Sequence, residues 1–520
     1  MNVFTRIKSR TYQDSLKLMR ISGEIQSMPD ILEAFAFMGT EINKKTRIPQ
    51  TLQSEETKNA GPDDLILLVK SNNEQAALAA LAAFDQKMNE TDTREKSTEQ
   101  SPATLDEGVE LRPEANLAVI SVPGEYAAYQ AMRALQLGLN VLLFSDHVSL
   151  DDEIALKDFA LEQNLLMMGP DCGTAIIGGV PLCFGNVVSR GGIGVVGASG
   201  TGTQELTSIV DVLGEGISHA IGTGGRDLSE KVDARMTVFA INLLAEDPQT
   251  KVIAVISKPP ASSAVKKVLD ALNKSKKPFV LVLTGASSEE DTKESHFAAS
   301  LEEGAAMAVA LMRGEDSTHA KHAFERKEFP RKLTESAALL SEKQKYLRGL
   351  FTGGTLASEA AWLIRRDIGS VITNTNIKGR KEWTGQVLPH EDIILDLGDD
   401  TFTQGAVHPM IDPSHRNQLV QDAIADPQTA LILCDVVIGT GSHPDPAGIL
   451  AQSVRTASSN VEHPPIVIAS ITGTEKDPQE RSKQKQILET AGVFVFDSAQ
   501  YAAETCVQII RQIRERRERR

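Results

Sequence analysis

The sequence has few cysteines, and they are scattered. Cys172, Cys183, Cys434 and Cys506 are the four in 520 residues, and none belongs to a C-x-x-C pair. We therefore expect neither a zinc site nor a disulfide framework, and free thiols suit a reducing compartment. No apolar run approaches the roughly 18 residues of a membrane helix, and no apolar leader is visible. We expect a cytoplasmic protein that does not bind membranes.

Positive charge is also in short supply. Lys and Arg number 54 against 70 Asp and Glu, the formal net charge is −16, and only 4% of the residues are aromatic. The sequence has no basic patch interleaved with aromatic residues, which argues against nucleic-acid binding. At this length we expect about three or four domains.

A glycine-rich stretch stands out between an apolar run and helix-forming residues. Residues 191–205 read Gly-Gly-Ile-Gly-Val-Val-Gly-Ala-Ser-Gly-Thr-Gly-Thr-Gln-Glu. A strand, a glycine turn and a helix start place free backbone N–H groups at the positive end of a helix dipole, which is a typical anion seat. No Gly-Lys-Ser/Thr motif is present, and a tight turn without a ligand is the alternative. We expect Gly197, Ser199, Gly200 and Thr201 to bind phosphate.

Strand, helix and linker signals divide the chain into six segments. We expect a small α+β domain over residues 1–90, a linker over 91–115, a βαβ unit over 116–188, an α/β domain over 189–312, a linker or partly helical connection over 313–345, and a second α/β domain over 346–520.

The two α/β domains are related by an internal repeat. Asp247-Pro-Gln-Thr250 and Asp426-Pro-Gln-Thr429 each precede a buried strand, and Thr352-Gly-Gly-Thr355 begins the second domain as the 197–203 turn begins the first. Coincidence between two helix-ending turns is the alternative.

The second domain contains another glycine turn, at residues 439–443. If the two domains face each other by pseudo-symmetry, the helices that begin near Ser199 and Ser442 would point at one shared anion. Gly439, Gly441 and Ser442 would then complete the phosphate site.

Several side chains near these turns could act as acids, bases or substrate ligands. Acid–base candidates are His408, His443, Asp412 and the Asp396-Leu-Gly-Asp-Asp400 cluster, and Arg226 and Asp227 follow the 222–225 glycine turn. The adjacent carboxylates of Asp399 and Asp400 are a weak signal for Mg²⁺. A residue in such a turn is more often a backbone cap than a catalyst. We select Ser199, His443 and Arg226 as catalytic. We expect no metal site. The residues expected to bind substrate are Asp171, Cys172, Gly224, Gly225, Arg226, Gly353 and Gly354.

Three of these motifs resemble the succinyl-CoA synthetase superfamily: the Asp-Pro-Gln-Thr tetrapeptide, Gly169-Pro-Asp-Cys-Gly-Thr174 and Gly194-Val-Val-Gly-Ala-Ser-Gly-Thr201. Residues 116–310 resemble the α subunit from the latter half of its CoA-binding domain, and residues from about 346 to 510 resemble the ligase domain of the β subunit. The resemblance implies a multidomain α/β fold, with a Rossmann-like unit, two flavodoxin-like domains and a small N-terminal α+β domain. It also implies two opposed helices, matching residues 197–203 and 439–443, that hold the phosphate.

Nearly the whole chain also resembles the FdrA family. The shared segments occur in the same order: Gly197-Ala-Ser-Gly-Thr-Gly202, Gly224-Gly-Arg-Asp-Leu-Ser229, Ser257-Lys-Pro-Pro-Ala261, Thr352-Gly-Gly-Thr-Leu-Ala357, Asp396-Leu-Gly-Asp-Asp400 and His408-Pro-Met-Ile-Asp-Pro413.

The chain departs from the ligase superfamily where that family carries a phosphorylated histidine. His296 is the histidine in the corresponding region, and it lacks the flanking glycines of the family's Gly-His-Ala-Gly loop. No ATP-grasp domain is present, and residues 1–115 replace the glycine-rich first half of the CoA-binding domain. These departures do not favour acyl-CoA ligation by this chain alone, and they make CoA a doubtful ligand.

The FdrA resemblance implies a subunit of an oxamate carbamoyltransferase that works with other subunits in anaerobic allantoin breakdown. Phosphate would be a substrate, no firm cofactor is implied, and Arg226 could hold the carboxylate of the carbamoyl donor. We expect a hetero-oligomer that could also form homodimers. The alternatives are an acyl-CoA ligase-type enzyme whose nucleotide domain lies on a partner, and a non-catalytic scaffold subunit.

Overall fold

A computed structural model of the chain describes residues 2–11, 13, 15–26, 28–40, 43–44, 54–89, 102–257, 260–284, 297–326, 331–385, 388–403 and 407–518. The chain forms two compact units, the first ending at Pro102 and the second beginning at Ala103. No helix in the described ranges is long and apolar enough to cross a membrane.

The N-terminal unit is a small α+β fold around a three-stranded antiparallel sheet in the order β1-β3-β2. Its elements are β1 (Asn2–Lys8), α1 (Ser15–Gln26), β2 (Ile31–Met38), α3 (Glu55–Asn59), β3 (Leu65–Ser71) and α4 (Glu74–Asn89). The central strand β3 is almost entirely buried, as its apolar sequence requires, and its inward residues pack with α1 and α4 in one core. The predicted small α+β domain is therefore present.

The second unit begins with a short parallel sheet in the order β4-β5-β6. Its elements are α5 (Leu105–Leu111), β4 (Leu117–Ile120), α6 (Gly124–Gln136), β5 (Asn140–Leu143), α7 (Leu150–Glu162) and β6 (Met167–Met168). Two boundaries differ from the sequence expectation. Helix α5 lies inside the expected linker, and the hairpin of β7 (Thr174–Ile177) and β8 (Val180–Cys183) joins the next sheet, because Ile176 pairs with Ala220 there.

We call the following α/β domain the first repeat. Its elements are β9 (Arg190–Gly197), α8 (Gly200–Val212), β10 (Ile217–Gly222), α9 (Arg235–Glu246), β11 (Val252–Ser257), α10 (Ser262–Ser275), β12 (Phe279–Leu283), β13 (Phe297–Ala298) and α11 (Leu301–Arg313). The connection that follows is partly helical, with η2 (Ser317–His319) and α12 (Arg331–Leu339).

The second repeat occupies the rest of the chain. Its elements are β14 (Tyr346–Phe351), α13 (Gly354–Ile368), β15 (Ile372–Thr373), β16 (Lys381–Glu382), β17 (Ile393–Asp396), α14 (Asp400–Thr403), α15 (Ser414–Ala425), β18 (Thr429–Val437), α16 (Pro446–Ser458), β19 (Ile466–Thr472), α17 (Arg481–Thr490), β20 (Phe494–Phe496) and α18 (Ala499–Glu518).

Sheet topology confirms the internal repeat. The sheet orders are β13-β12-β11-β9-β10-β7-β8 and β16-β15-β17-β14-β18-β19-β20. The parallel strands β10-β9-β11-β12-β13 of the first sheet thus correspond to β17-β14-β18-β19-β20 of the second. The shared tetrapeptide builds the same turn twice. The hydroxyl groups of Thr250 and Thr429 donate to the carboxylates of Asp247 and Asp426, which also accept the amides of Gln249 and Gln428.

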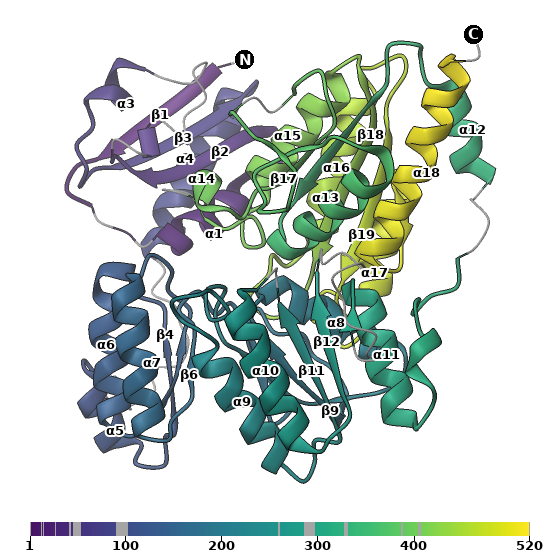
Figure 1. Cartoon of the computed structure of the whole chain (residues 1–520). Coiled ribbons are helices and arrows are strands. Elements are labelled where there is room, and N and C mark those ends of the chain that lie inside the picture. Colours follow the sequence, from purple (N-terminus) through teal and green to yellow (C-terminus); the bar gives the residue numbers. More distant parts are fainter. Residues whose placement is uncertain are drawn as a thin grey trace. The chain divides into compact units, whose positions relative to one another are not determined.

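The two repeats share one apolar core. Helices α8 and α11 of the first repeat and α13 and α18 of the second contribute to a single cluster that includes Leu206, Leu356 and Ile510. Helices α9 and α10 cover the other face of the first sheet, on the near side in Figure 1, and α15, α16 and α17 pack on the other face of the second. This layering brings the N-termini of α8 and α13 together. The predicted multidomain α/β fold is confirmed.

Candidate functional site

The predicted anion seat lies at the N-terminus of α8. Strand β9 ends at Gly197, where a Cβ atom would collide with the side chain of Thr203. The Ser199 hydroxyl caps the helix by accepting the amide of Gly202 at 3.0 Å. Among the described residues, the amides of Ser199, Gly200 and Thr201 have no hydrogen-bond acceptor. We call Ser199, Gly200 and Thr201 the open helix start.

A buried hydroxyl group faces this start. Thr174, the first residue of β7, is 2% exposed, and its Oγ1 atom has no hydrogen-bond partner in the described part of the chain. A Cβ atom on Gly200 would lie 3.5 Å from that oxygen. Buried polar groups are rarely left unsatisfied, and the helix dipole favours negative charge here, so these groups are suited to an oxyanion.

The helix start that meets α8 is that of α13. The hydroxyl groups of Ser199 and Thr355 lie 2.5 Å apart, and a Cβ atom on Gly353 would come within 3.0 Å of Thr201. The two helices belong to different repeats, and their N-termini meet through this contact, whereas the sequence named the 439–443 turn as the partner of α8. Gly353 and Gly354, predicted to bind substrate, lie at this junction.

The predicted role of the 439–443 turn as the partner of α8 stays a prediction. The helix after the 439–443 turn, α16, begins at Pro446 and is capped by Asp445 rather than Ser442. Gly439 and Gly441 approach the 183–186 segment instead, and Thr440 donates to the carbonyl oxygens of Cys183 and Gly185. The Ser442 hydroxyl is buried without a partner among the described residues. The turn joins the second repeat to the segment after β8.

The start of α13 already contains carboxylates. Both oxygens of the buried Asp435 accept hydrogen bonds: Oδ1 from the Thr352 amide at 2.7 Å, and Oδ2 from the Gly353 amide at 2.7 Å and the Thr352 hydroxyl at 3.0 Å. Burial raises the pKa of Asp435, whereas the Arg416 charge and these three donors favour its ionised form. A Cβ atom on Gly354 would collide with the carboxylate of Asp396. We call residues 353–355 with Asp396 and Asp435 the filled helix start.

Arg226 is engaged within the protein. Its Nε lies 2.8 Å from Glu153, and its NH2 donates to the carbonyl oxygen of Val148 at 2.8 Å. Glu153 also contacts Lys157, which is fully buried and forms a second ion pair, with Asp227. Its side chain is 46% exposed, and its predicted substrate-binding role stays a prediction.

Cys172 is not suited to nucleophilic attack. Burial raises the pKa of its thiol to about 12, and its sulfur contacts the carbonyl oxygens of Thr174 and Gly222. The neighbouring Asp171 approaches the 224–225 turn, where a Cβ atom on Gly225 would lie 3.6 Å from its carboxylate. These residues shape the strand ends beneath α8.

The two histidine candidates occupy the same loop cluster. Nδ1 of His443 accepts the amide of Asp445, and the amide of His443 donates to the carbonyl oxygen of Met410. Nδ1 of His408 accepts the amide of Met410, and burial lowers the pKa of His408 to about 4. Both imidazoles thus serve as backbone acceptors, the alternative that the sequence left open. His296 lies outside the described residues.

One group of exposed side chains has the composition of a metal site. Ligand atoms of Asp146, His147 and Asp400 all lie within 4.8 Å of one another, a set that suits a divalent cation. The hydrogen bond from His147 to Asp146, with Asp400 nearby, raises the pKa of His147. The sequence suggested Asp399 as the second metal ligand beside Asp400, whereas in the structure His147 and Asp146 lie beside Asp400.

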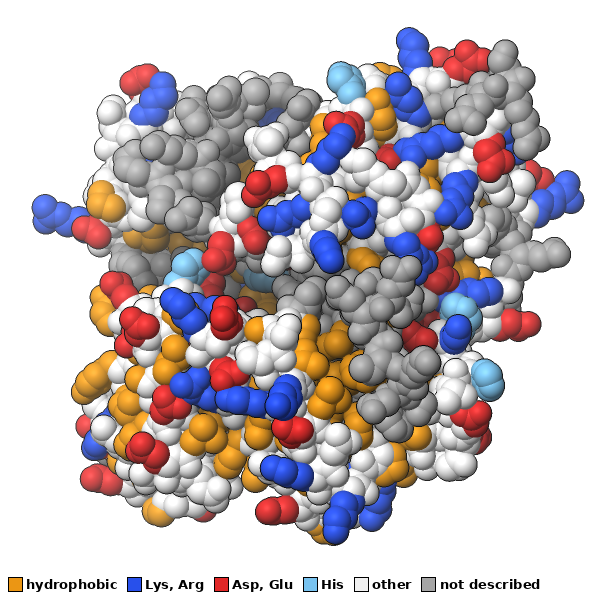
Figure 2. All heavy atoms as spheres, viewed as in Figure 1, with side chains coloured by type: hydrophobic (Ala, Val, Ile, Leu, Met, Phe, Trp, Pro, Cys, Tyr) orange, Lys and Arg blue, Asp and Glu red, His pale blue; other side chains and the backbone are white. Residues whose placement is uncertain are grey.

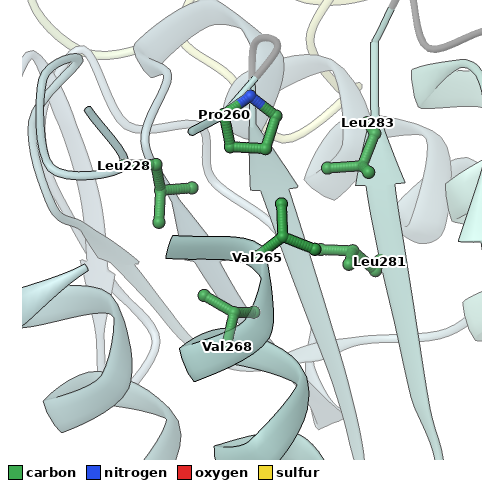
Figure 3. A pocket seen from close by; sticks show the side chains of 6 residues that line it. All are labelled: Leu228, Pro260, Val265, Val268, Leu281 and Leu283. Atoms are coloured by element: carbon green, nitrogen blue, oxygen red, sulfur yellow. The ribbon is translucent and has the colours of Figure 1, made fainter. Parts of the chain in front are cut away.

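An apolar pocket in the first repeat offers no such chemistry. Figure 3 shows its lining by Leu228, Pro260, Val265, Val268, Leu281 and Leu283. These side chains provide no polar group for an anion. On the face in Figure 2, basic and acidic side chains are interspersed.

Sequence reasoning missed three residues of the site. Asp435 sits inside β18, which is buried throughout, and nothing nearby marks it except its charge. Thr174 is the last residue of the quoted Gly169–Thr174 motif, but the sequence indicated no role for it and did not indicate that it lies close to α8. Thr355 was within the quoted Thr-Gly-Gly-Thr turn, but its pairing with Ser199 depends on how two repeats dock.

Three family descriptions match the chain. "CoA-ligase" matches residues 350–508, "CoA binding domain" matches residues 189–285, and "AllF, heavy metal-associated domain" matches residues 1–104. The CoA-binding match thus falls on the first repeat. Residues 1–104 contain neither cysteine nor histidine, so that segment lacks the thiolate and imidazole ligands that bind heavy metals.

Three relatives define the similarity more closely. The uncharacterized protein YahF of Escherichia coli (strain K12) is 40% identical over 506 residues, which cover 96% of this chain and 97% of YahF. The succinate–CoA ligase [ADP-forming] subunit alpha of Aquifex aeolicus is 28% identical over 38% of this chain and 66% of the subunit. The ADP-forming sulfoacetate-CoA ligase subunit SqwL of Acholeplasma sp is 27% identical over 34% of this chain and 62% of SqwL. The chain therefore spans less than two thirds of either ligase subunit.

Proposed function

Because the chain belongs to the succinyl-CoA synthetase-like family that includes YahF, we propose that it is the phosphate-binding subunit of a group-transfer enzyme. The reaction is carbamoyl transfer between oxalurate and phosphate, with oxamate and carbamoyl phosphate as products. The observation that carries the phosphate assignment is the open helix start: its amides and the nearby Thr174 hydroxyl have no partner among the described residues.

The proposed reaction needs no phosphorylated enzyme. A phosphate oxygen attacks the carbamoyl carbon of oxalurate, the bond from that carbon to the bridging nitrogen breaks, and the nitrogen takes a proton as oxamate leaves. The amides of Gly200 and Thr201 orient the phosphate, while Thr174 and Ser199 add hydroxyl contacts. Positioning is the main contribution expected from such a seat.

The choice of carbamoyl chemistry rests on the resemblance to the FdrA family. The AllF description of the first 104 residues supports a place in allantoin breakdown. We propose that other subunits bind oxalurate and complete the site, and that the assembly is a cytoplasmic hetero-oligomer. No metal or organic cofactor is part of this proposal.

The second candidate is an acyl-CoA ligase-type reaction with nucleotide bound by a partner. The CoA-ligase and CoA-binding matches favour it, since they cover most of both repeats. It predicts that the protein binds CoA and acquires a phosphoryl group from ATP, which His296 would carry.

We would test these functions by ³¹P NMR of the chain with oxalurate and phosphate, alone and with its candidate partner subunits. A carbamoyl phosphate resonance that requires the partners supports the proposal. A phosphoramidate signal after ATP and CoA are added, lost in His296→Ala, supports the ligase. Phosphate binding without turnover in any mixture leaves a scaffold subunit.

A further inference from the structure

Two buried glutamates cross between the repeats. Glu205 is the sixth residue of α8 and Glu359 is the sixth residue of α13, so they hold equivalent positions. Oε1 of Glu205 accepts the amide of Ala499, the first residue of α18, at 3.0 Å. Oε1 of Glu359 accepts the amide of Leu301, the first residue of α11, at 2.7 Å. Each glutamate thus caps the last helix of the other repeat.

A second pair of contacts is exchanged in the same way. The Ser300 hydroxyl donates to Gln500 at 2.6 Å, and the Ser498 hydroxyl donates to Glu302. Because both serines directly precede their helices, the junction has a consistent pseudo-two-fold pattern. A departure from this pattern is therefore informative.

The pattern breaks at the second oxygen of Glu359. Oε2 of Glu205 accepts the hydroxyl of Thr472 at the end of β19. The strand registers make Thr284, just after β12, the equivalent residue, but its hydroxyl donates to the carbonyl oxygen of Ser257 at 3.2 Å. Within the described part of the chain, Oε2 of Glu359 is left without a hydrogen-bond partner, and Glu359 is only 1% exposed.

The surroundings of Glu359 oppose a negative charge. Carboxylates face it from all three neighbouring helices: Glu205 on α8, Glu302 on α11 and Glu504 on α18. The nearby cation, Arg326, pairs with Glu302 at 2.8 Å and Glu504 at 2.9 Å. Burial, more than these like charges, raises the pKa of Glu359 to about 8.

We propose that Glu359 is a proton-dependent contact between the two repeats: its neutral carboxylic acid holds α13 against α11, and ionisation weakens that junction. The proton resides on Oε2, since Oε1 accepts the Leu301 amide. Thr355 on α13 contacts Ser199 of the open helix start, so ionisation also lowers phosphate affinity. This last consequence rests on the proposed function, whereas the effect on stability does not.

The sign of the stability effect follows from linkage. The folded protein keeps the Glu359 proton up to about pH 8, while an unfolded chain releases it near the usual value of 4.5. The contribution of the neutral acid to stability is therefore complete below pH 4.5 and is lost as the pH rises to about 8. Above that pH it changes no further.

The test compares the thermal midpoint of the full chain with that of Glu359→Gln between pH 5 and pH 9. Gln keeps the acceptor for Leu301 and removes the titration. We expect the midpoint of Glu359→Gln, relative to the unaltered protein, to rise steadily from pH 5 to pH 8 and then level off. A difference that does not vary with pH would overturn the proposal.

Two further measurements separate this group from its mate and from folding failure. Glu205→Gln should lower the midpoint at every pH value, because both oxygens of Glu205 already accept hydrogen bonds and one of them becomes an amide donor. Burial raises the pKa of Glu205 as well, so a pH-dependent part is expected on top of this loss. Infrared spectra of the unaltered protein should contain a protonated carboxylic acid band that disappears between pH 7 and pH 9. If that band is absent at pH 6, the inference fails even where Glu359→Gln does not fold. If the unaltered protein has this band but does not bind phosphate, only the proposed function is contradicted.

Discussion

The two repeats begin with equivalent helices, but their N-termini are electrostatically different. At the open helix start, the amide of Ala198 donates to the carbonyl oxygen of Ile256, and the next three amides have no acceptor among the described residues. At the filled helix start, the equivalent amide of Thr352 and that of Gly353 donate to Asp435. When the repeats are aligned on their tetrapeptides, Asp435 takes the place of Ile256.

This difference teaches that a glycine-rich helix start is not by itself a ligand site. Asp435 supplies from within the protein the negative charge that the helix dipole favours, and Arg416 lies 3.8 Å from it as a counter-ion. An external anion would meet two carboxylates at the filled helix start, Asp396 and Asp435. We therefore expect one phosphate for each chain, held mainly by the first repeat.

The largest effect should come from placing a carboxylate at the open start. In Gly200→Asp, the added Cβ makes an ordinary contact with Thr174, and its carboxylate competes for the free amides. Phosphate affinity, measured by calorimetry, should fall more than about 100-fold, which corresponds to the loss of two charge-assisted hydrogen bonds. Stability should rise by about 0.5 kcal/mol, because the new charge favours the dipole. Unchanged affinity would show that the seat lies elsewhere.

Removing the internal carboxylate should have the next largest effect. Asp435→Ala leaves Arg416 buried without its counter-ion, so the free energy of unfolding should drop by about 3 kcal/mol. Phosphate should recover part of this loss by binding the vacated amides of Thr352 and Gly353. Denaturant titration with and without phosphate measures both quantities. If phosphate stabilises Asp435→Ala no more than the unaltered protein, the filled start is not a latent anion seat.

How far the sequence predicts this arrangement depends on the range of the contacts. Local patterns predicted the turn before α8, the N-terminal α+β fold and the repeat, because each depends on neighbouring residues. The pairing of Ser199 with Thr355 spans 156 positions, and the 439–443 turn was an equally good glycine motif. Which helix start faces α8 is decided by the shared core of four helices, a property of docking that no short motif records. Asp435 was overlooked because a single acid inside an apolar strand does not disturb the pattern.

The capping residues provide a smaller test of the same comparison. Ser199→Ala should reduce stability by about 1 kcal/mol, since it removes the cap of Gly202 and the partner of Thr355. At the filled start the equivalent residue is Gly353, where a serine Cβ would lie 3.1 Å from Asp435 and 3.0 Å from Thr201. Gly353→Ser should therefore lose stability by crowding. Chemical denaturation of both variants measures these changes in the free energy of unfolding. A gain in stability for Gly353→Ser would show that the filled helix start accommodates a side chain at residue 353.

The smallest expected effect concerns the hydroxyl group that faces the open start. Thr174→Val removes Oγ1 with little change of shape, and that atom has no protein partner to lose among the described residues. Stability should therefore stay within about 0.5 kcal/mol, while phosphate affinity falls by about tenfold, the value of one hydrogen bond near 1.4 kcal/mol. Thr355→Val is the matched control at the other start: it breaks the bond with Ser199, so it should lower stability as well. Equal losses of stability in the two variants would mean that the Thr174 hydroxyl is structural, and the anion would then be held by the backbone of α8 alone.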